Sequence, residues 1–285
     1  MKIGIAGANL PPYSEGNRAI ELARLAEDVG IESLWTYEHI VVPSSYRSMY
    51  PYSPNGRMPE EGAELVEPLD WIAFLAGATH RIRFGTGMLV LPQHNPVMVA
   101  KRAATIDRLS GGRLSLGVGA GWLREEFDAL GAPWAHRGQR MEEYIKLIRK
   151  LWTEEETTFD GHFVRLDRVR CLPKPLQTPG VPIIIGGHTD TAAIRAGRIG
   201  DGFYPSASPD RLDQLVKLVK QSAEDAMRDP ETIEITAGIG SEWSPDLIHR
   251  YEEIGVSRIN INLSGRTSSE LHRSLELLHD TIIRK

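Results

Sequence analysis

The sequence almost lacks cysteine, and it contains no metal-binding motif and no long apolar segment. Cys171 is the only cysteine among 285 residues, so no intramolecular disulfide can form, which is typical of a reducing compartment. The nine histidines form neither an H-x-H pair nor an H-E-x-x-H motif, and we therefore expect no metal site. The longest nearly apolar stretch, 84–92, is far shorter than a membrane span, and the N-terminal segment lacks the pattern of a signal peptide. These absences predict a cytoplasmic protein.

Clusters of basic residues are also missing. The 33 lysines and arginines are scattered and are outnumbered by 38 aspartates and glutamates, which leaves a net charge of −5. We expect no nucleic-acid partner and no membrane-surface partner, since both would require a basic patch. The apolar fraction of 41% and the chain length are sufficient for a large core without disulfides.

Short apolar runs alternate along the chain with longer segments of helical periodicity, such as 17–29, which ends at Gly30. Strands are predicted at 3–6, 33–37, 82–90, 114–118, 183–185, 202–204, 233–239 and 256–261. Helices are predicted at 17–29, 69–79, 97–109, 140–152, 191–199 and 269–283, with two more starting after the Ser-Pro-Asp sequences at 208–210 and 244–246.

Eight strand–helix units in one chain of this length favour an α/β fold of the (β/α)8 TIM-barrel class over the alternative, an open doubly wound sheet. The predicted strands are continuous apolar runs, as expected for parallel strands that are buried on both faces. A predicted hairpin at 157–169 forms an insertion between strands 4 and 5. No linker is visible, so we predict a single domain over 1–285.

In such a barrel the chemistry lies at the C-terminal ends of the strands, and here these ends are rich in glycine and poor in acids and lysines. This composition disfavours metal-dependent hydrolysis and Schiff-base chemistry, and it favours an organic cofactor. The segment Gly186-Gly187-His188-Thr189 joins a strand to a helix and is a candidate phosphate site, the alternative being a tight turn with an ordinary N-cap.

Other candidates follow strands 2, 3 and 4. His39, next to Glu38, is a candidate general acid or base that Glu38 would orient, the alternative being a structural pair. Gly85 and Gly87 interrupt a buried strand, which indicates either a bulge beside a ligand or close packing. The loop 41–67 is long enough to form a lid over the mouth, or else it is a surface insertion.

Together these segments resemble the bacterial-luciferase-like oxidoreductase family, especially its coenzyme F420-dependent branch. The resembling segments are SLWTYEHIVVP (33–43), the stretch 81–127 that includes FGTGMLVLPQHNPVMVAK and LGVGAGWLREEF, RGQRMEEYIKLIRKLW (137–152), 159–177, and IIIGGHTDTAAIRAGRIGDGFYP (183–205). They extend over nearly the whole chain.

The resemblance implies a homodimeric barrel that binds F420 or FMN at its mouth. It implies that Gly186, Gly187, His188 and Thr189 hold the cofactor phosphate, that Gly121 lies at the cofactor, and that a non-proline cis peptide between Gly87 and Met88 backs the ring. The strand-2 pair that is Asp-His in F420-dependent sugar-phosphate dehydrogenases is Glu38-His39 here. The glutamate that those enzymes carry after strand 4 is Trp122 here, which makes sugar-phosphate oxidation doubtful and suggests an apolar substrate pocket formed with Tyr50 and the other lid tyrosines.

Three functions follow from this resemblance. F420-dependent hydride transfer to or from a small organic substrate is favoured, with His39 and Glu38 as the catalytic residues. The alternatives are an FMN-dependent monooxygenase that works with a separate flavin reductase, and a noncatalytic member that keeps only the fold. The intact GGHT sequence argues against the last.

Overall fold

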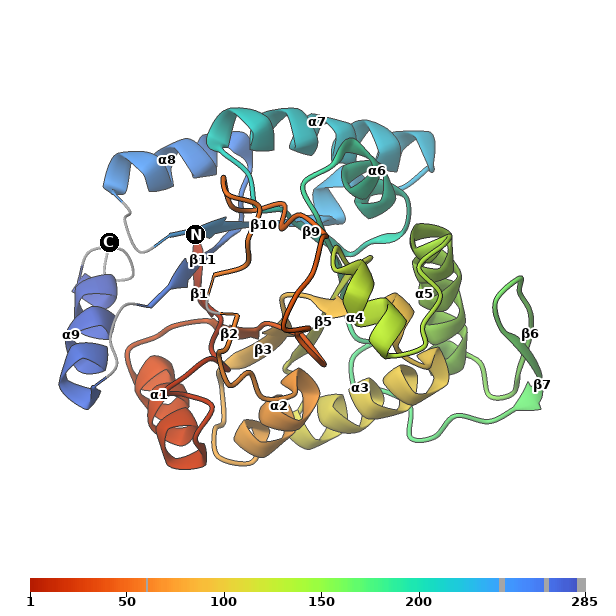
Figure 1. Ribbon diagram of the computed structural model, residues 1–285, viewed down its shortest axis with the longest axis horizontal. Coiled ribbons are helices and arrows are strands. Elements are labelled where there is room, and N and C mark those ends of the chain that lie inside the picture. The colour runs from red at the N-terminus through yellow and green to blue at the C-terminus, as the bar shows by residue number, and fades with distance from the viewer. Residues whose placement is uncertain (60, 241–243, 264–266, 281–285) are drawn as a thin grey trace.

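The computed structural model describes residues 1–59, 61–240, 244–263 and 267–280. In these residues eight parallel strands close into a barrel (Figure 1). In order around the barrel, the strands are β1 (Lys2–Ala6), β2 (Ser33–Thr36), β3 (Arg83–Thr86) continued by β4 (Leu89–Val90), β5 (Leu114–Gly119), β8 (Ile183–Gly186), β9 (Gly202–Tyr204), β10 (Glu234–Ile239) and β11 (Arg258–Asn262). Because β1 pairs with both β2 and β11, the sheet has no edge, and the predicted TIM barrel is confirmed over the open sheet.

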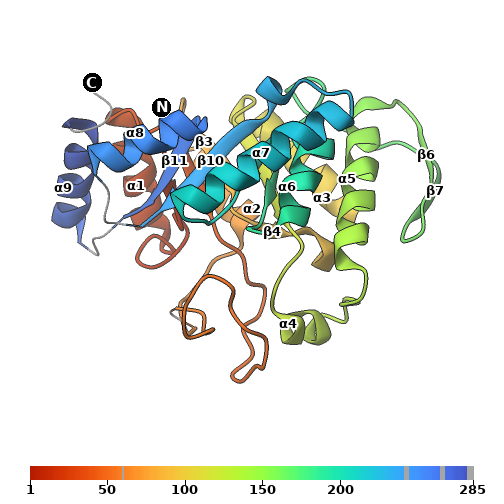
Figure 2. The same cartoon turned by 90° about the horizontal axis from the view of Figure 1, so that it is seen from above.

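The helices form the outer ring of the barrel. They are α1 (Gly16–Asp28), α2 (Pro68–Ala76), α3 (Pro96–Ser110), α5 (Arg137–Thr153), α6 (Asp190–Ile199), α7 (Pro209–Asp225), α8 (Pro245–Ile254) and α9 (Ser268–Leu278). The predicted hairpin is present as β6 (Thr157–Asp160) and β7 (Arg165–Val169), and it projects beyond α5 between the fourth and fifth barrel strands (Figure 2). The terminal helix was predicted to reach residue 283, but α9 ends at Leu278, and 281–285 lie outside the described residues.

Helix ends follow the capping signals of the sequence. The Asn95 side chain accepts hydrogen bonds from the N–H groups of Val97 and Met98 at the start of α3, which ends at Gly111 in the left-handed conformation. Ser244 caps α8 in the same way through the Leu247 N–H. Ser208 occupies the N-cap of α7 as predicted, although its side chain makes no capping hydrogen bond.

Three short helical elements were not predicted. The six-residue α4 (Arg124–Ala129) follows β5, the 3₁₀ helix η1 (Leu91–Gln93) follows β4, and the 3₁₀ helix η2 (Pro230–Thr232) precedes β10. Each is too short to show a full period of apolar residues. Of these, α4 matters most, because it lies at the mouth of the barrel.

The inside of the barrel combines large side chains with glycines on the facing strands. Trp35, Ile184 and Tyr204 form a buried cluster with Met88. Gly4 pairs in register with Asn260 on one side and with Ser33 on the other. Because Gly4 has no side chain, the side chains of these two neighbours can occupy the space beside it. At the N-terminal end the buried Arg258 pairs with Glu32 and Glu234 and closes that end of the barrel.

The third barrel strand is broken in two. The sequence predicted one strand over 82–90, whereas the structure has β3 and β4 separated at Gly87 and Met88. A non-proline cis peptide joins these two residues, as the family resemblance implies. The Gly87 N–H still donates to the Thr36 carbonyl at 2.7 Å, so the bulge remains tied to β2.

No helix in the described ranges is long and apolar enough to cross a membrane. The same residues also contain no group of three or more histidines, cysteines, aspartates or glutamates arranged to hold a metal ion.

Candidate active site

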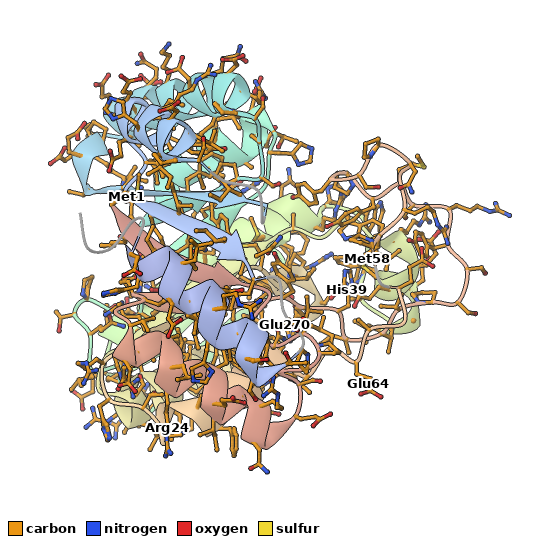
Figure 3. The ribbon with its side chains drawn as sticks, turned by 90° about the vertical axis from the view of Figure 1, so that its left-hand side faces the viewer. Met1, Arg24, His39, Met58, Glu64 and Glu270 are labelled. Atoms are coloured by element: carbon orange, nitrogen blue, oxygen red, sulfur yellow. The ribbon has the colours of Figure 1, made fainter. Side chains whose placement is uncertain are left out.

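The C-terminal ends of the strands open toward the long segment between β2 and α2. This segment, called the lid below, extends from Tyr37 to Glu67, and Figure 2 shows that it projects together with α4 from one end of the barrel. In Figure 3, His39, Met58 and Glu64 lie on the lid side, and Met1 lies on the opposite side. The loop predicted at 41–67 therefore lies at the mouth.

The floor of the mouth is formed by Met88 and the glycines around it. A Cβ atom on Gly186 would lie 2.3 Å from Met88 Cγ, and one on Gly119 would lie 3.3 Å from Met88 Cβ. The Met88 side chain therefore uses the space that these glycines leave. Below it, Trp35 and Tyr204 meet edge to face with ring centroids 5.4 Å apart, and burial raises the pKa of Tyr204 to about 12. Met88, Trp35 and Tyr204 themselves carry no charge at neutral pH.

The candidate phosphate segment connects β8 to α6. Gly187 has a φ of +127°, a conformation that side chains rarely adopt, and Thr189 Oγ accepts a hydrogen bond from the Ala192 N–H. The N-cap that was the alternative interpretation is thus present. His188 Nδ1 is buried without a hydrogen-bond partner, and burial followed by the charge of Arg211 lowers the pKa of His188. This segment has the glycines, the helix N-terminus and the unpaired nitrogen that suit a phosphate group.

Glu38 does not orient His39, which corrects the prediction from the sequence. Its buried carboxylate accepts hydrogen bonds from the Val90 N–H and from His94 Nε2, the latter at 2.9 Å. Burial alone would lower the pKa of His94, but the hydrogen bond and the charge of Glu38 outweigh burial and raise it. Glu38 therefore links the end of β2 to β4 and to the start of α3, which is a structural role.

His39 pairs instead with Glu126 on α4. His39 Nδ1 lies 3.0 Å from Glu126 Oε2, and Glu126 Oε1 accepts from the N–H groups of Ile40 at 2.6 Å and Val41 at 3.3 Å. The Glu126 side chain is 1% exposed, so this carboxylate is held in a dry environment. His39 Nε2 makes no hydrogen bond to any residue that the structure describes.

Aromatic rings extend from His39 across the mouth to the phosphate segment. Trp122 meets His39, Tyr46 and Tyr50 edge to face at centroid distances of 5.8, 5.7 and 5.1 Å. The row continues from Tyr50 to Tyr52 at 5.3 Å and from Tyr52 to His188 at 5.1 Å. The structure thus brings the predicted Trp122 and Tyr50 together between His39 and His188.

Gly121 directly precedes Trp122 and lies in a tightly packed turn. Its φ is +83°, and a Cβ atom there would lie 2.7 Å from both Phe127 and Val90. Its carbonyl accepts a hydrogen bond from Arg137 Nε at 3.1 Å. Gly121 therefore fixes the turn from β5 into α4.

Asn9 ties the two ends of the lid together. Its amide nitrogen donates to the carbonyls of Tyr37 at 2.9 Å and Val66 at 2.8 Å, and its oxygen accepts from the Tyr37 N–H at 2.8 Å. Asn9 is completely buried, so these backbone groups depend on it for their hydrogen bonds.

Replacing Asn9 by alanine is expected to lower the free energy of unfolding by about 2 kcal/mol or more, because several backbone groups lose their partner at once. Urea unfolding followed by circular dichroism measures this loss. Asn17→Ala, at an exposed position of α1, is the matched control and should change stability by less than about 0.5 kcal/mol. Equal stability of the two variants would show that Asn9 does not hold the lid.

Glu125 holds the middle of the lid. Its carboxylate accepts from the N–H groups of Arg47 at 2.6 Å and Ser48 at 3.2 Å and from the Ser48 hydroxyl at 2.7 Å. The hydrogen bond from the Arg47 backbone, followed by that from the Ser48 hydroxyl, lowers the pKa of Glu125 to about 2. Consecutive glutamates of α4 thus contact two different segments of the lid.

A carboxyl whose pKa is lowered by folding stabilises the fold fully above its unfolded pKa and loses that contribution as the pH falls toward its folded pKa. For Glu125 this window runs from 4.5 down to about 2. Between these values we expect the free energy of unfolding to fall more steeply in the unmodified protein than in Glu125→Gln. Urea unfolding at several pH values measures both slopes, and parallel slopes would contradict the assignment.

Sequence reasoning missed Glu126, Glu125, His94 and Asn9. Glu125 and Glu126 belong to a helix too short to be predicted, and His94 and Asn9 lie in loops whose partners are far away in the sequence. The position of Glu126 could have identified it as a candidate. It is an acidic residue in the connection that follows strand 4, and this region was predicted to lie at the mouth.

Residues 4–243 match the sequence pattern of the luciferase-like monooxygenase family. A Mycobacterium tuberculosis protein of uncharacterized function is 33% identical over 276 residues, which cover 93% of this chain and 94% of that protein. An F420-dependent glucose-6-phosphate dehydrogenase of Amycolatopsis mediterranei is 32% identical over 234 residues, 80% of this chain and 65% of that enzyme. The matching proteins include F420-dependent enzymes and also a monooxygenase that depends on reduced FMN.

Among solved structures, an F420-dependent secondary alcohol dehydrogenase in complex with an F420–acetone adduct superposes with a TM-score of 0.80. The match covers 99% of this chain and 98% of that chain at 20% sequence identity. At this identity the likeness supports the fold.

Proposed function

The chain belongs to the luciferase-like monooxygenase family, and on this basis we propose that it is an F420-dependent oxidoreductase that transfers a hydride to or from a small organic substrate. The observation that carries the proposal is the pairing of His39 with a buried carboxylate at a mouth lined by glycines and aromatic rings. Members of the family use either a flavin or a deazaflavin, and the F420-type sequence stretches at 81–127 and 183–205 favour the deazaflavin.

In this proposal the segment Gly186-Gly187-His188-Thr189 holds the cofactor phosphate. The unpaired His188 Nδ1 and the positive φ of Gly187, which brings the backbone close without a side chain, are the features that fit the phosphate. Met88, with Gly87 beside it, backs the ring system, and Gly121 shapes the wall next to it. When bound, F420 supplies a ring carbon that accepts or donates a hydride.

His39 is the proposed catalytic acid or base. In alcohol oxidation Nε2 takes the hydroxyl proton, and in carbonyl reduction the protonated ring returns it. The Trp122 ring meets His39 edge to face, and Tyr50 packs on Trp122, so an uncharged alcohol or carbonyl compound with an apolar body fits better than a sugar phosphate.

The test is a parallel titration of the purified protein with F420 and with FMN at the same salt concentration, followed by fluorescence. We expect F420 to bind with a micromolar Kd and FMN to bind much more weakly. Tight FMN binding with weak F420 binding would favour the second candidate, an FMN-dependent monooxygenase supplied by a separate reductase, which the FMN-dependent relative supports. If neither cofactor bound, both proposals would fail.

We also propose that the chain forms a homodimer. Met98 and Leu109 on α3 are 57% and 69% exposed, and Leu172 and Leu176, in the segment bound along α3, are similarly exposed. Exposed apolar side chains on one face are typical of subunit contacts. Sedimentation velocity would give the mass of two chains, and the mass of one chain would refute the proposal.

A further inference from the structure

Two histidine–glutamate pairs flank the end of β2. Glu38 pairs with His94, while His39, the next residue, pairs with Glu126. The first pair is satisfied within the protein, because Glu38 also accepts from the Val90 N–H. The second leaves one imidazole nitrogen, His39 Nε2, without a hydrogen-bond partner among the described residues.

We propose that Glu126 is the positioning residue of His39, a role that rests on the proposed function. Its carboxylate accepts a hydrogen bond from Nδ1–H, so the neutral ring carries its proton on Nδ1 and presents the lone pair of Nε2 to the substrate. The same carboxylate binds the N–H groups of Ile40 and Val41 and thereby fixes the backbone that directly follows His39. Both the side chain and the main chain at His39 are held by one group.

Contacts on both sides of α4 hold Glu126 in position next to His39. Phe127 is 1% exposed and packs edge to face on Trp134 at a centroid distance of 5.2 Å, which anchors the helix next to Glu126. Glu125 binds the lid at Arg47 and Ser48 from the same turn. The position of Glu126 is therefore set by packing on one side and by the lid on the other.

The Glu126 carboxylate can also stabilise the charge that His39 gains when it takes a proton from the substrate. When an alcohol is oxidised, His39 Nε2 would take the O–H proton, and the bound cofactor would supply the two-electron acceptor for the C–H hydride as the C=O bond forms. The resulting imidazolium would lie beside the Glu126 carboxylate, whose Oε2 is 3.0 Å from His39 Nδ1. That carboxylate stabilises the cation through its charge in a dry environment.

The other polar groups near His39 are already engaged or neutral. Glu38 is bound to His94, and Tyr46 and Tyr50 approach through Trp122. Burial raises the pKa of Tyr50, and burial together with the hydrogen bond to Glu61 raises that of Tyr46, so both remain uncharged at neutral pH. Among the described residues, Glu126 is therefore the carboxylate in hydrogen-bond contact with the His39 ring.

The experiment uses the protein without cofactor. In ¹⁵N NMR spectra of the unmodified protein, the neutral His39 ring should be the Nδ1–H tautomer, and finding the Nε2–H tautomer would overturn the proposal. In Glu126→Leu, which removes the acceptor of the Nδ1–H hydrogen bond and keeps a side chain of similar size, the neutral His39 ring should change to the Nε2–H tautomer that a free histidine side chain prefers. Glu143→Leu is the matched control, because the Glu143 carboxylate also accepts backbone N–H groups but lies on α5 beside the hairpin, and this variant should leave the His39 tautomer unchanged. An unchanged tautomer in Glu126→Leu would also overturn the proposal.

With F420 bound, Glu126→Gln should lower kcat at least about 10-fold, because the amide cannot stabilise the imidazolium through charge. The cofactor Kd should stay within about twofold of the unmodified value. Because the NMR results do not depend on any cofactor, they test Glu126 separately: failure of F420 binding would refute the proposed function, and a wrong tautomer would refute the positioning role.

Discussion

Replacing His39 by asparagine is expected to lower kcat by about 10²- to 10⁴-fold, the usual contribution of a general acid or base. Asparagine keeps a polar side chain of similar reach but cannot exchange a proton at neutral pH. The F420 Kd should remain within about twofold, since the proposed phosphate contacts lie at Gly186–Thr189 and do not involve His39. Hydride transfer is measured by the absorbance change of the deazaflavin with a panel of uncharged alcohols and carbonyl compounds.

The matched control for this variant is His249→Asn, because the His249 side chain on α8 is 73% exposed and far from the mouth in sequence and fold. It should leave both kcat and the cofactor Kd unchanged. Equal kcat values for His39→Asn and the unmodified protein would remove His39 from the catalytic role, whatever the cofactor proves to be.

The second large effect is expected for Gly117→Ala in β5. A Cβ atom at Gly117 would lie 1.8 Å from the Thr86 carbonyl oxygen and 3.0 Å from Met88 Sδ. The first of these is a backbone atom of the neighbouring strand and cannot rotate away. Thr86 Oγ1 also donates to the Gly117 carbonyl at 2.6 Å, which holds the two strands together. We expect a loss of about 3 kcal/mol or more in the free energy of unfolding.

Because Met88 lies beside the same clash, the folded fraction of Gly117→Ala should also bind the cofactor more weakly. Gly62→Ala provides the control, since nothing lies within 4 Å of a Cβ atom at Gly62. Urea unfolding and cofactor titration measure the two effects. A Gly117→Ala protein as stable as Gly62→Ala would mean that the packing between β5 and the third strand differs from the structure described.

The elements of the barrel could be predicted because they depend on local patterns. Apolar runs such as 183–185 marked the strands, and Gly30 and the Ser-Pro-Asp sequences at 208–210 and 244–246 marked helix ends within a few residues. The Asp160-Gly161 sequence marked the hairpin in the insertion. The number of units then distinguished the barrel from an open sheet.

The partners of the site residues could not be predicted in the same way. Glu38 and His39 are adjacent in sequence, yet successive side chains of an extended chain point to opposite sides, so one reaches His94 and the other Glu126. The partners lie 56 and 87 residues away, and their meeting depends on how the strand ends are arranged around the mouth. Asn9 illustrates the same limit, because its three hydrogen bonds follow from the tertiary fold.

In the proposed function a deazaflavin binds at the mouth, between the interrupted third strand and His39. A crystal structure of the protein soaked with F420 would show whether it does. We expect the ring system against Met88, the phosphate on Gly186–Thr189, and His39 Nε2 facing the reactive face of the ring. A mouth without cofactor at saturating F420, or a ring bound away from Met88 and His39, would contradict it.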